Sequence, residues 1–166
     1  PMKDNTPLYR YPGSHAREHG ELEQYRASNR ANLQCKESIE AAIREHYRDN
    51  RLDPAGAQQV LDDFGAERVT YLLANTIRWA DWDLRYSRNN KAWAQTIPVY
   101  PNPDFEGHDR NANYIINSHP GLVDLFTDQT REELKLRQQE KASVRKQLKE
   151  TTAAPTKHTP VKQQER

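Results

Sequence analysis

The distribution of apolar residues predicts one long amphipathic helix near the start of the chain. Between Glu21 and about Tyr47 the sequence contains neither Gly nor Pro. Over this stretch, apolar side chains recur at the three- and four-residue spacing that places them on one face of an α-helix. The positions that carry this pattern are Leu22, Tyr25, Cys35, Ile39, Ala42, Ile43 and Tyr47.

Start and stop signals predict further helices after this one. Asp53-Pro54 is typical of an N-cap followed by the first helical position, and Phe64-Gly65 is typical of a helix end. A third helix is expected over residues 66–77, with one apolar face. Residues 79–94 are expected to make a turn and then a helix capped by a serine, Ser87. Ser118 or His119 is expected to cap a last helix, with Pro120 in its first turn, that continues to about Lys149.

Two short apolar runs between the last two helices predict extended structure. TIPVY (96–100) and NYIIN (113–117) are separated by a stretch rich in Pro, Gly and Asn, which is typical of a loop. We interpret the two runs as a small antiparallel β-pair. The expected fold class is therefore α+β and predominantly α-helical, with the long N-terminal helix packed against three or four further helices.

Charge and composition divide the chain into unequal parts. Residues 1–130 hold 15 Lys/Arg and 19 Asp/Glu, whereas residues 131–166 hold 10 and 5. We expect an N-terminal arm (1–20), a single helical domain (21–137), a polar helix extension (138–150) and a disordered basic tail (151–166). The acidic balance of the domain argues against a compact nucleic-acid-binding domain, and leaves weak phosphate contact to the tail.

The composition also bears on the compartment. The mean hydropathy is -1.13 and no run approaches the ~18 apolar residues of a membrane span. The single cysteine, Cys35, excludes an internal disulfide and is typical of a reducing cytoplasm. We expect a soluble cytoplasmic protein with no membrane partner.

One motif raises the question of a metal enzyme. HAREH (15–19) fits the H-x-x-E-H pattern of the inverted zincins, in which two imidazoles share one helix face. A catalytic zinc needs a third protein ligand, and no further ligand motif is recognisable. Cys35 lies on the apolar stripe and has no recognisable triad partner. We therefore predict no catalytic residues, no metal ligands and no cofactor.

The apolar stripe of the long helix contains a polar break. Ser28, Asn29, Asn32 and Lys36 occupy positions where Leu or Ile is expected. Buried amides need partners, so these side chains either tie down another segment or line a polar pocket together with His119. The first interpretation is favoured, because buried Asn is more often structural.

The segment from Trp79 to Trp93 is the strongest candidate for a contact surface. Aromatic residues interleaved with cations are typical of protein interfaces and also of base stacking. The acidic domain favours a protein partner, and the helical spacing of Trp93 favours a place in the core. The predicted partner-binding residues are Trp79, Trp82, Arg85, Tyr86, Arg88 and Lys91.

Four stretches together resemble a known family. They are YRASNRANLQCKESIEAAI (25–43), LDPAGAQQVLDDFGAERVTYLLANT (52–76), RYSRNNKAWAQTIPV (85–99) and RNANYIINSHPGLVDLFTDQTREEL (110–134). Over about residues 9–137 the chain resembles an uncharacterised family, a domain of unknown function carried by conjugative and other mobile elements of gut Firmicutes. The resemblance implies a place on a mobile element in the cytoplasm of a bacterial host. It brings no activity and no site residues, but small proteins of such elements often counter host defences.

Three functions follow as hypotheses. The first is a non-catalytic accessory protein of a mobile element that binds a host or element protein, such as an inhibitor of a defence nuclease of the CRISPR or restriction type. The second is a nucleic-acid-binding accessory protein of conjugation. The third and least favoured is an enzyme with a pocket formed by Asn29, Asn32, Lys36 and His119.

Overall fold

The predicted long helix is α2, Leu22–His46. The computed structural model describes residues 4–98 and 112–158. Within α2 the buried positions follow the predicted stripe and include two residues of its polar break, Ser28 and Asn32. They are Ser28, Ala31, Asn32, Cys35, Ile39, Ala42 and Ile43. The stripe therefore packs against the rest of the fold along most of its length.

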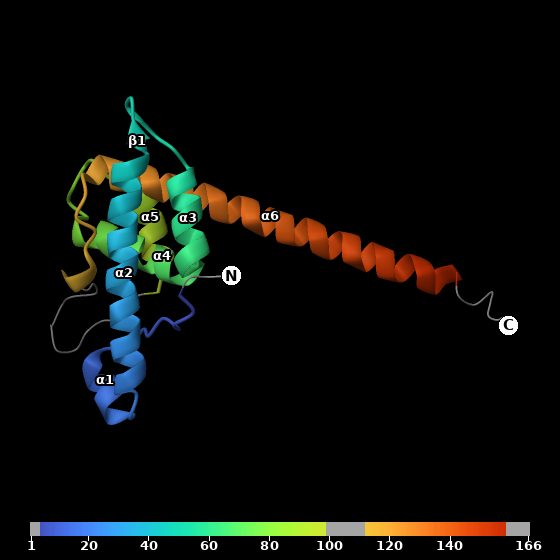
Figure 1. Cartoon of the computed structure of the whole chain (residues 1–166), viewed down its shortest axis with the longest axis horizontal. Helices are drawn as coiled ribbons and strands as arrows, with labels where there is room; N and C mark the ends of the chain where they lie inside the picture. The colour runs from blue at the N-terminus through green and yellow to red at the C-terminus, as the bar shows by residue number, and fades with distance from the viewer. Residues whose placement is uncertain (1–3, 99–111, 159–166) are drawn as a thin grey trace. The chain divides into compact units, whose positions relative to one another are not determined.

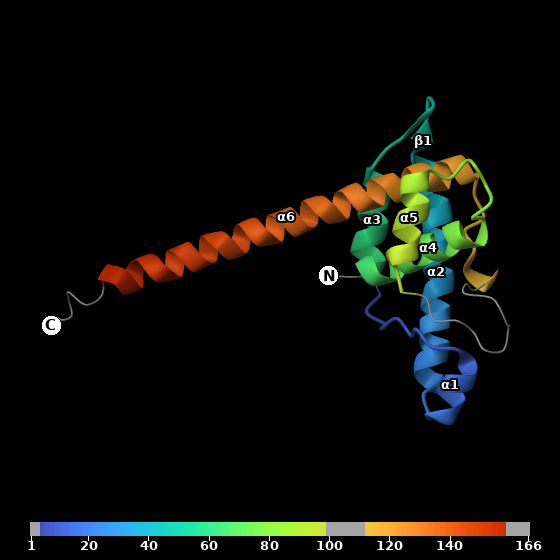
Figure 2. The same cartoon turned by 180° about the vertical axis from the view of Figure 1, so that it is seen from behind.

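Four more helices of the first part of the chain gather around α2. A short helix, α1 (Gly13–Glu18), lies against the N-terminal end of α2, and α3 (Ala55–Phe64) packs beside its C-terminal half. The helices α4 (Ala66–Trp79) and α5 (Arg88–Thr96) complete the cluster, as Figure 1 and the reverse view in Figure 2 show. Gly65, with φ of 85°, ends α3 and starts α4, a backbone conformation that favours glycine.

The central element of this cluster is α4. The sequence predicts one apolar face for it, but every residue from Tyr71 to Arg78 is buried. Such a helix needs neighbours on all sides, and α2, α3, α5 and a 3₁₀ helix, η1 (Ala112–Tyr114), all contact it. Its polar residues are satisfied within the core: the Thr76 hydroxyl donates to the Leu72 carbonyl (2.9 Å) and accepts from the Ile116 amide (3.0 Å).

A buried arginine of α4 ties the N-terminal segment to α2. The Arg68 side chain is buried, and its guanidinium donates to Asn32 Oδ1 (2.8 Å) and to Ser28 Oγ (3.0 Å). It also donates to the backbone carbonyls of Thr6 (2.8 Å) and Pro7 (3.4 Å). Burial lowers the pKa of Arg68. The polar break in α2 thus accepts hydrogen bonds from a cation that the sequence analysis did not identify.

The small sheet exists, but the predicted location was wrong. The strands are β1 (Tyr47–Arg48) and β2 (Arg51–Leu52), antiparallel, with Tyr47 opposite Leu52. The two residues between them, Asp49 and Asn50, have φ of 52° and 63°, which is the requirement of a two-residue type I′ hairpin.

The residues predicted to form the pair have other structures. Thr96 ends α5, and residues 113 and 114 belong to η1, while residues 99 and 100 lie outside the described part of the chain. Residues 115–117 follow as irregular backbone. Here side chains satisfy the backbone amides: Ile116 donates to Thr76 Oγ1 and Asn117 donates to Glu40 Oε2 (2.7 Å). The apolar run is buried without a strand partner because helices supply its acceptors.

The last helix, α6 (Pro120–His158), begins as predicted after His119. The His119 Nδ1 accepts from the Gly121 amide (3.0 Å). A polar cluster joins the start of α6 to α5. The side-chain amide of the buried Asn90 donates to Asp124 Oδ1 and to Asp128 Oδ1, both at 2.8 Å. Arg131 donates to Asn90 Oδ1 (2.8 Å). Burial raises the pKa of Asp128.

The chain divides into two compact units between Arg131 and Glu132. The N-terminal arm belongs to the first unit. In the second unit α6 continues to His158, whereas the sequence analysis expects the tail to start at residue 151. Residues 159–166 and the Pro-rich residues 99–111 lie outside the described part of the chain. Among the described helices, none is long and apolar enough to cross a membrane.

Replacing Asn32 with alanine tests the buried arginine cluster. We expect Asn32→Ala to lower the free energy of unfolding by about 1–3 kcal/mol, because the Arg68 Nε–H loses its acceptor inside the core. Urea denaturation measures this change. The control is Gln34→Ala on the exposed side of α2, expected to stay within about 0.5 kcal/mol of the wild type. Equal stability of the two variants would contradict the assignment.

Candidate protein-binding site

The connection between α4 and α5 carries two large apolar side chains in solvent. Trp82 is 77% exposed and Leu84 is 93% exposed, while Trp79 at the end of α4 is 41% exposed. A single exposed apolar residue is ordinary, but three within six positions put an unusual amount of apolar surface in one short stretch of the chain. We call Trp79, Trp82 and Leu84 the apolar loop patch.

Hydrogen bonds hold this connection in one conformation. Asp83 lies between the two exposed residues, is itself buried, and donates its amide to the Ala80 carbonyl (2.9 Å). Its carboxylate accepts from the Arg85 amide (2.9 Å) and from the Arg85 guanidinium at 3.0 and 2.8 Å. These bonds lower the pKa of Asp83 to about 2. The loop therefore presents the patch on a backbone that is already ordered.

The structure corrects the predicted set of contact residues at Tyr86. This side chain is 4% exposed and belongs to the core, so it does not take part in a surface contact. Burial raises its pKa to about 12. Trp93 is half-buried, with the Arg131 guanidinium 5.6 Å from its ring centre.

The predicted cations of the segment differ in their availability. Arg85 is bound to Asp83, so its first role is to fix the loop. Arg88 is exposed at the start of α5, and Lys91, one turn later, is half-buried. The Ser87 hydroxyl between loop and helix accepts from the Asn90 amide (3.1 Å), as the predicted cap requires. Leu84, the most exposed apolar residue, was missed because its neighbours in sequence give no sign of its orientation.

The residues of the predicted polar pocket take part in separate contacts. Asn29 Oδ1 accepts from the Tyr114 hydroxyl, whereas Asn32 accepts from Arg68. Lys36 pairs with Glu40 (2.8 Å), and His119 caps α6. These contacts fasten the N-terminal segment and residues 114–117 to α2. Arg68 was missed by sequence reasoning, and the only signal was a cation within a helix otherwise predicted to be core.

The two HAREH histidines lie side by side, His15 within α1 and His19 as its C-cap. Their rings stack with centres 3.9 Å apart, and the His15 Nε2 is 3.9 Å from Glu21 Oε1. The His19 Nδ1 is 2.9 Å from the His15 carbonyl oxygen. Among the described residues, no group of three or more His, Cys, Asp or Glu side chains is placed to hold a metal ion.

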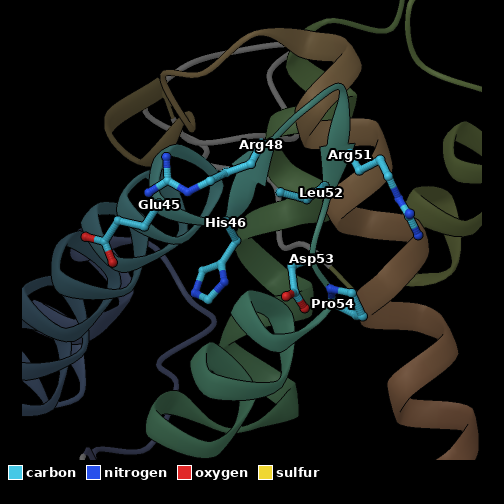
Figure 3. Close-up of a pocket in the computed structure, with 7 residues that line it drawn as sticks. All are labelled: Glu45, His46, Arg48, Arg51, Leu52, Asp53 and Pro54. Carbon is cyan, nitrogen blue, oxygen red and sulfur yellow. The ribbon is translucent and has the colours of Figure 1, made fainter.

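A polar hollow of about 570 Å³ lies beside the hairpin. Its lining runs from the end of α2 through both strands to the start of α3: Glu45, His46, Arg48, Arg51, Leu52, Asp53 and Pro54. In Figure 3 Arg48 and Arg51 extend in opposite directions from the hairpin, so they do not converge on one anion. The Asp53 carboxylate accepts from the Ala55 amide (2.9 Å).

The chain thus has a mainly helical α+β fold with an exposed apolar loop held by hydrogen bonds. A family model described as "Protein of unknown function (DUF3849)" matches residues 8–135. The chain belongs to this family. No curated protein and no solved structure matches the chain. The matched residues are nearly those over which the sequence resembles a known family, about 9–137. The description of the family names no activity.

The loop conformation should respond to acid through Asp83. Because the pKa of Asp83 is about 2 in the fold and about 4 in an unfolded chain, its ionised form stabilises the fold above pH 4. That contribution is lost as the pH falls from about 4 toward 2. The melting temperature of Asp83→Asn should therefore lie below that of the wild type at neutral pH, with the gap closing near pH 2.

The exposed neighbour Asp81 provides the control for this measurement. Asp81→Asn removes the same charge from the same loop, and it should show no comparable gap at neutral pH. A gap for Asp83→Asn that keeps its size down to pH 2 would show that the Asp83 carboxylate is not what orders the loop.

Proposed function

We propose that this protein is a non-catalytic binding protein that contacts a partner protein through the apolar loop patch. The observation that carries the proposal is the exposure of Trp82 and Leu84 on a backbone fixed by the Asp83–Arg85 pair. Arg88, exposed at the start of α5, follows the patch closely in the sequence. Trp and Arg are the residue types most enriched among the side chains that dominate binding energy.

Energetic reasoning supports this use of the loop. Burying an exposed Trp or Leu side chain contributes about 1.5–3 kcal/mol each, and none of this is gained while they face water. A loop ordered before binding loses little conformational entropy on association. The loop therefore offers a partner apolar surface to bury, and little of the binding free energy is spent on ordering the loop.

The partner proposed is a host protein met by a mobile element, with a defence nuclease as the first to test. The support for this is the resemblance to a family of mobile elements, together with a surface suited to binding rather than chemistry. A small protein that blocks a nuclease needs a rigid surface and no reacting groups. The loop patch meets that need.

The test compares binding by a loop variant with binding by a matched surface variant. We expect Trp82→Ser with Leu84→Ser to keep the melting temperature and to weaken a partner about 30-fold or more, the equivalent of about 2 kcal/mol. The control, Leu33→Ser with Leu125→Ser, removes two other exposed apolar side chains. It should bind as the wild type does.

Candidate partners come from affinity capture in the bacterial host, followed by titration of the purified protein. Inhibition assays with purified CRISPR and restriction nucleases test the proposed class of partner directly. A partner bound equally by the wild type, the loop variant and the control would contradict the loop as the binding surface. Inhibition of no nuclease by a chain that binds another host protein would contradict only the proposed partner.

A further inference from the structure

The second unit carries a separation of charge along α6. Residues 132–150 of this helix contain six cations and four carboxylates. At about 100° per residue, the cations all fall on one half of the helix surface and the carboxylates all fall on the other. The cations are Lys135, Arg137, Lys141, Arg145, Lys146 and Lys149, and the carboxylates are Glu132, Glu133, Glu140 and Glu150. We call the first set the basic face of α6.

Four of these cations follow one another at successive helical turns. Arg137, Lys141, Arg145 and Lys149 are spaced four residues apart, so each cation has another as its neighbour. Like charges at this spacing destabilise a helix by about 0.2–0.5 kcal/mol per pair. The repeat therefore costs stability in the free chain, and an external anion would relieve it.

Most of the basic face is available to such an anion. Arg137 pairs with Glu133 (2.8 Å). The other five cations are exposed, and none of them forms an ion pair with a described residue. The four carboxylates of residues 132–150 fall on the opposite half of the helix, and of these only Glu133 has an ion pair with a cation of the basic face, Arg137.

The composition of this face distinguishes between a protein and a nucleic acid as the ligand. Protein interfaces centre on aromatic and other apolar anchors and are depleted of Lys. Residues 132–151 contain no aromatic residue, so they lack the usual anchors of a protein interface. The exposed Val144 and Leu148 are four residues apart, but Arg137 and Lys141 interrupt the heptad spacing that a coiled coil with a second copy needs. A regular row of cations instead matches a regular row of phosphates.

We propose that the basic face of α6 binds the sugar–phosphate backbone of duplex nucleic acid, without sequence preference. From Arg137 to Lys149 the helix rises about 18 Å, a length over which duplex DNA presents about ten phosphate charges. Lys and Arg contacts to phosphate position a protein without reading bases. The sequence alone placed possible phosphate contact in residues 151–166, whereas the helix places it earlier, over residues 135–149.

This site is independent of the proposed protein contact. The apolar loop patch belongs to the first unit and the basic face to the second, so each is removed without altering the other. Loss of duplex binding with protein binding intact would therefore bear on this inference alone.

The test titrates a labelled 20-base-pair duplex of arbitrary sequence with the full-length chain from 50 to 200 mM salt. Contact with four phosphates predicts a slope of log K against log salt of about -3.6 and a loss of affinity of about 100-fold over this range. Lys141→Glu with Arg145→Glu and Lys149→Glu should abolish most of the affinity and make the slope shallower by about 2.7.

The control is Arg17→Glu with Arg26→Glu and Arg30→Glu, which changes net charge equally at exposed positions of α1 and α2. This control variant should keep most of the wild-type affinity for the duplex and a similar slope of log K against log salt. Neutral Gln substitutions at the three α6 positions should weaken binding in the same direction, and circular dichroism verifies that the helix is kept. Equal losses in the α6 and control variants would overturn the proposal, as would undetectable binding at 50 mM salt. Equally tight binding of poly-glutamate would also overturn it, in favour of an acidic polypeptide.

Discussion

The first unit depends on a cation enclosed by neutral oxygens. Arg68 is 2% exposed, and its four hydrogen bonds go to side chains of α2 and to backbone carbonyls of the N-terminal segment. A buried charge without acceptors costs several kcal/mol, so α4, which carries Arg68, must come together with the two segments that supply the acceptors for the core to close. Ser28 and Asn32 interrupt an apolar stripe for this reason.

Local patterns allowed most of the helices to be predicted, since helix periodicity and capping depend on neighbouring residues. The limits of α2 and α3 and the Ser87 cap followed from such patterns. The sheet did not, because the apolar run NYIIN (113–117) was interpreted as a strand, and Asp49-Asn50 was not recognised as a hairpin turn. Whether a buried amide bonds to a strand or to a side chain such as Thr76 is decided by tertiary contacts.

In the candidate site, too, the sequence did not predict which single side chains are exposed and which are buried. Trp82 and Tyr86 are four residues apart in one aromatic segment, yet the first faces water and the second is in the core. The segment is a turn, so no helical or strand period assigns its residues to faces. The directions of its side chains depend on the Asp83–Arg85 pair and on the packing of α5. Neither can be predicted from the spacing of apolar residues.

The contacts of Arg68 also show that the fold begins before the first residue of the family match. The match begins at residue 8, whereas two acceptors of the guanidinium are carbonyls of Thr6 and Pro7. A fragment cut at the limits of the match would retain the buried cation and lose half of the residues that satisfy it. In this chain the residues just before the family match are therefore needed to satisfy a buried cation, although they are not buried themselves and act through their backbone carbonyls.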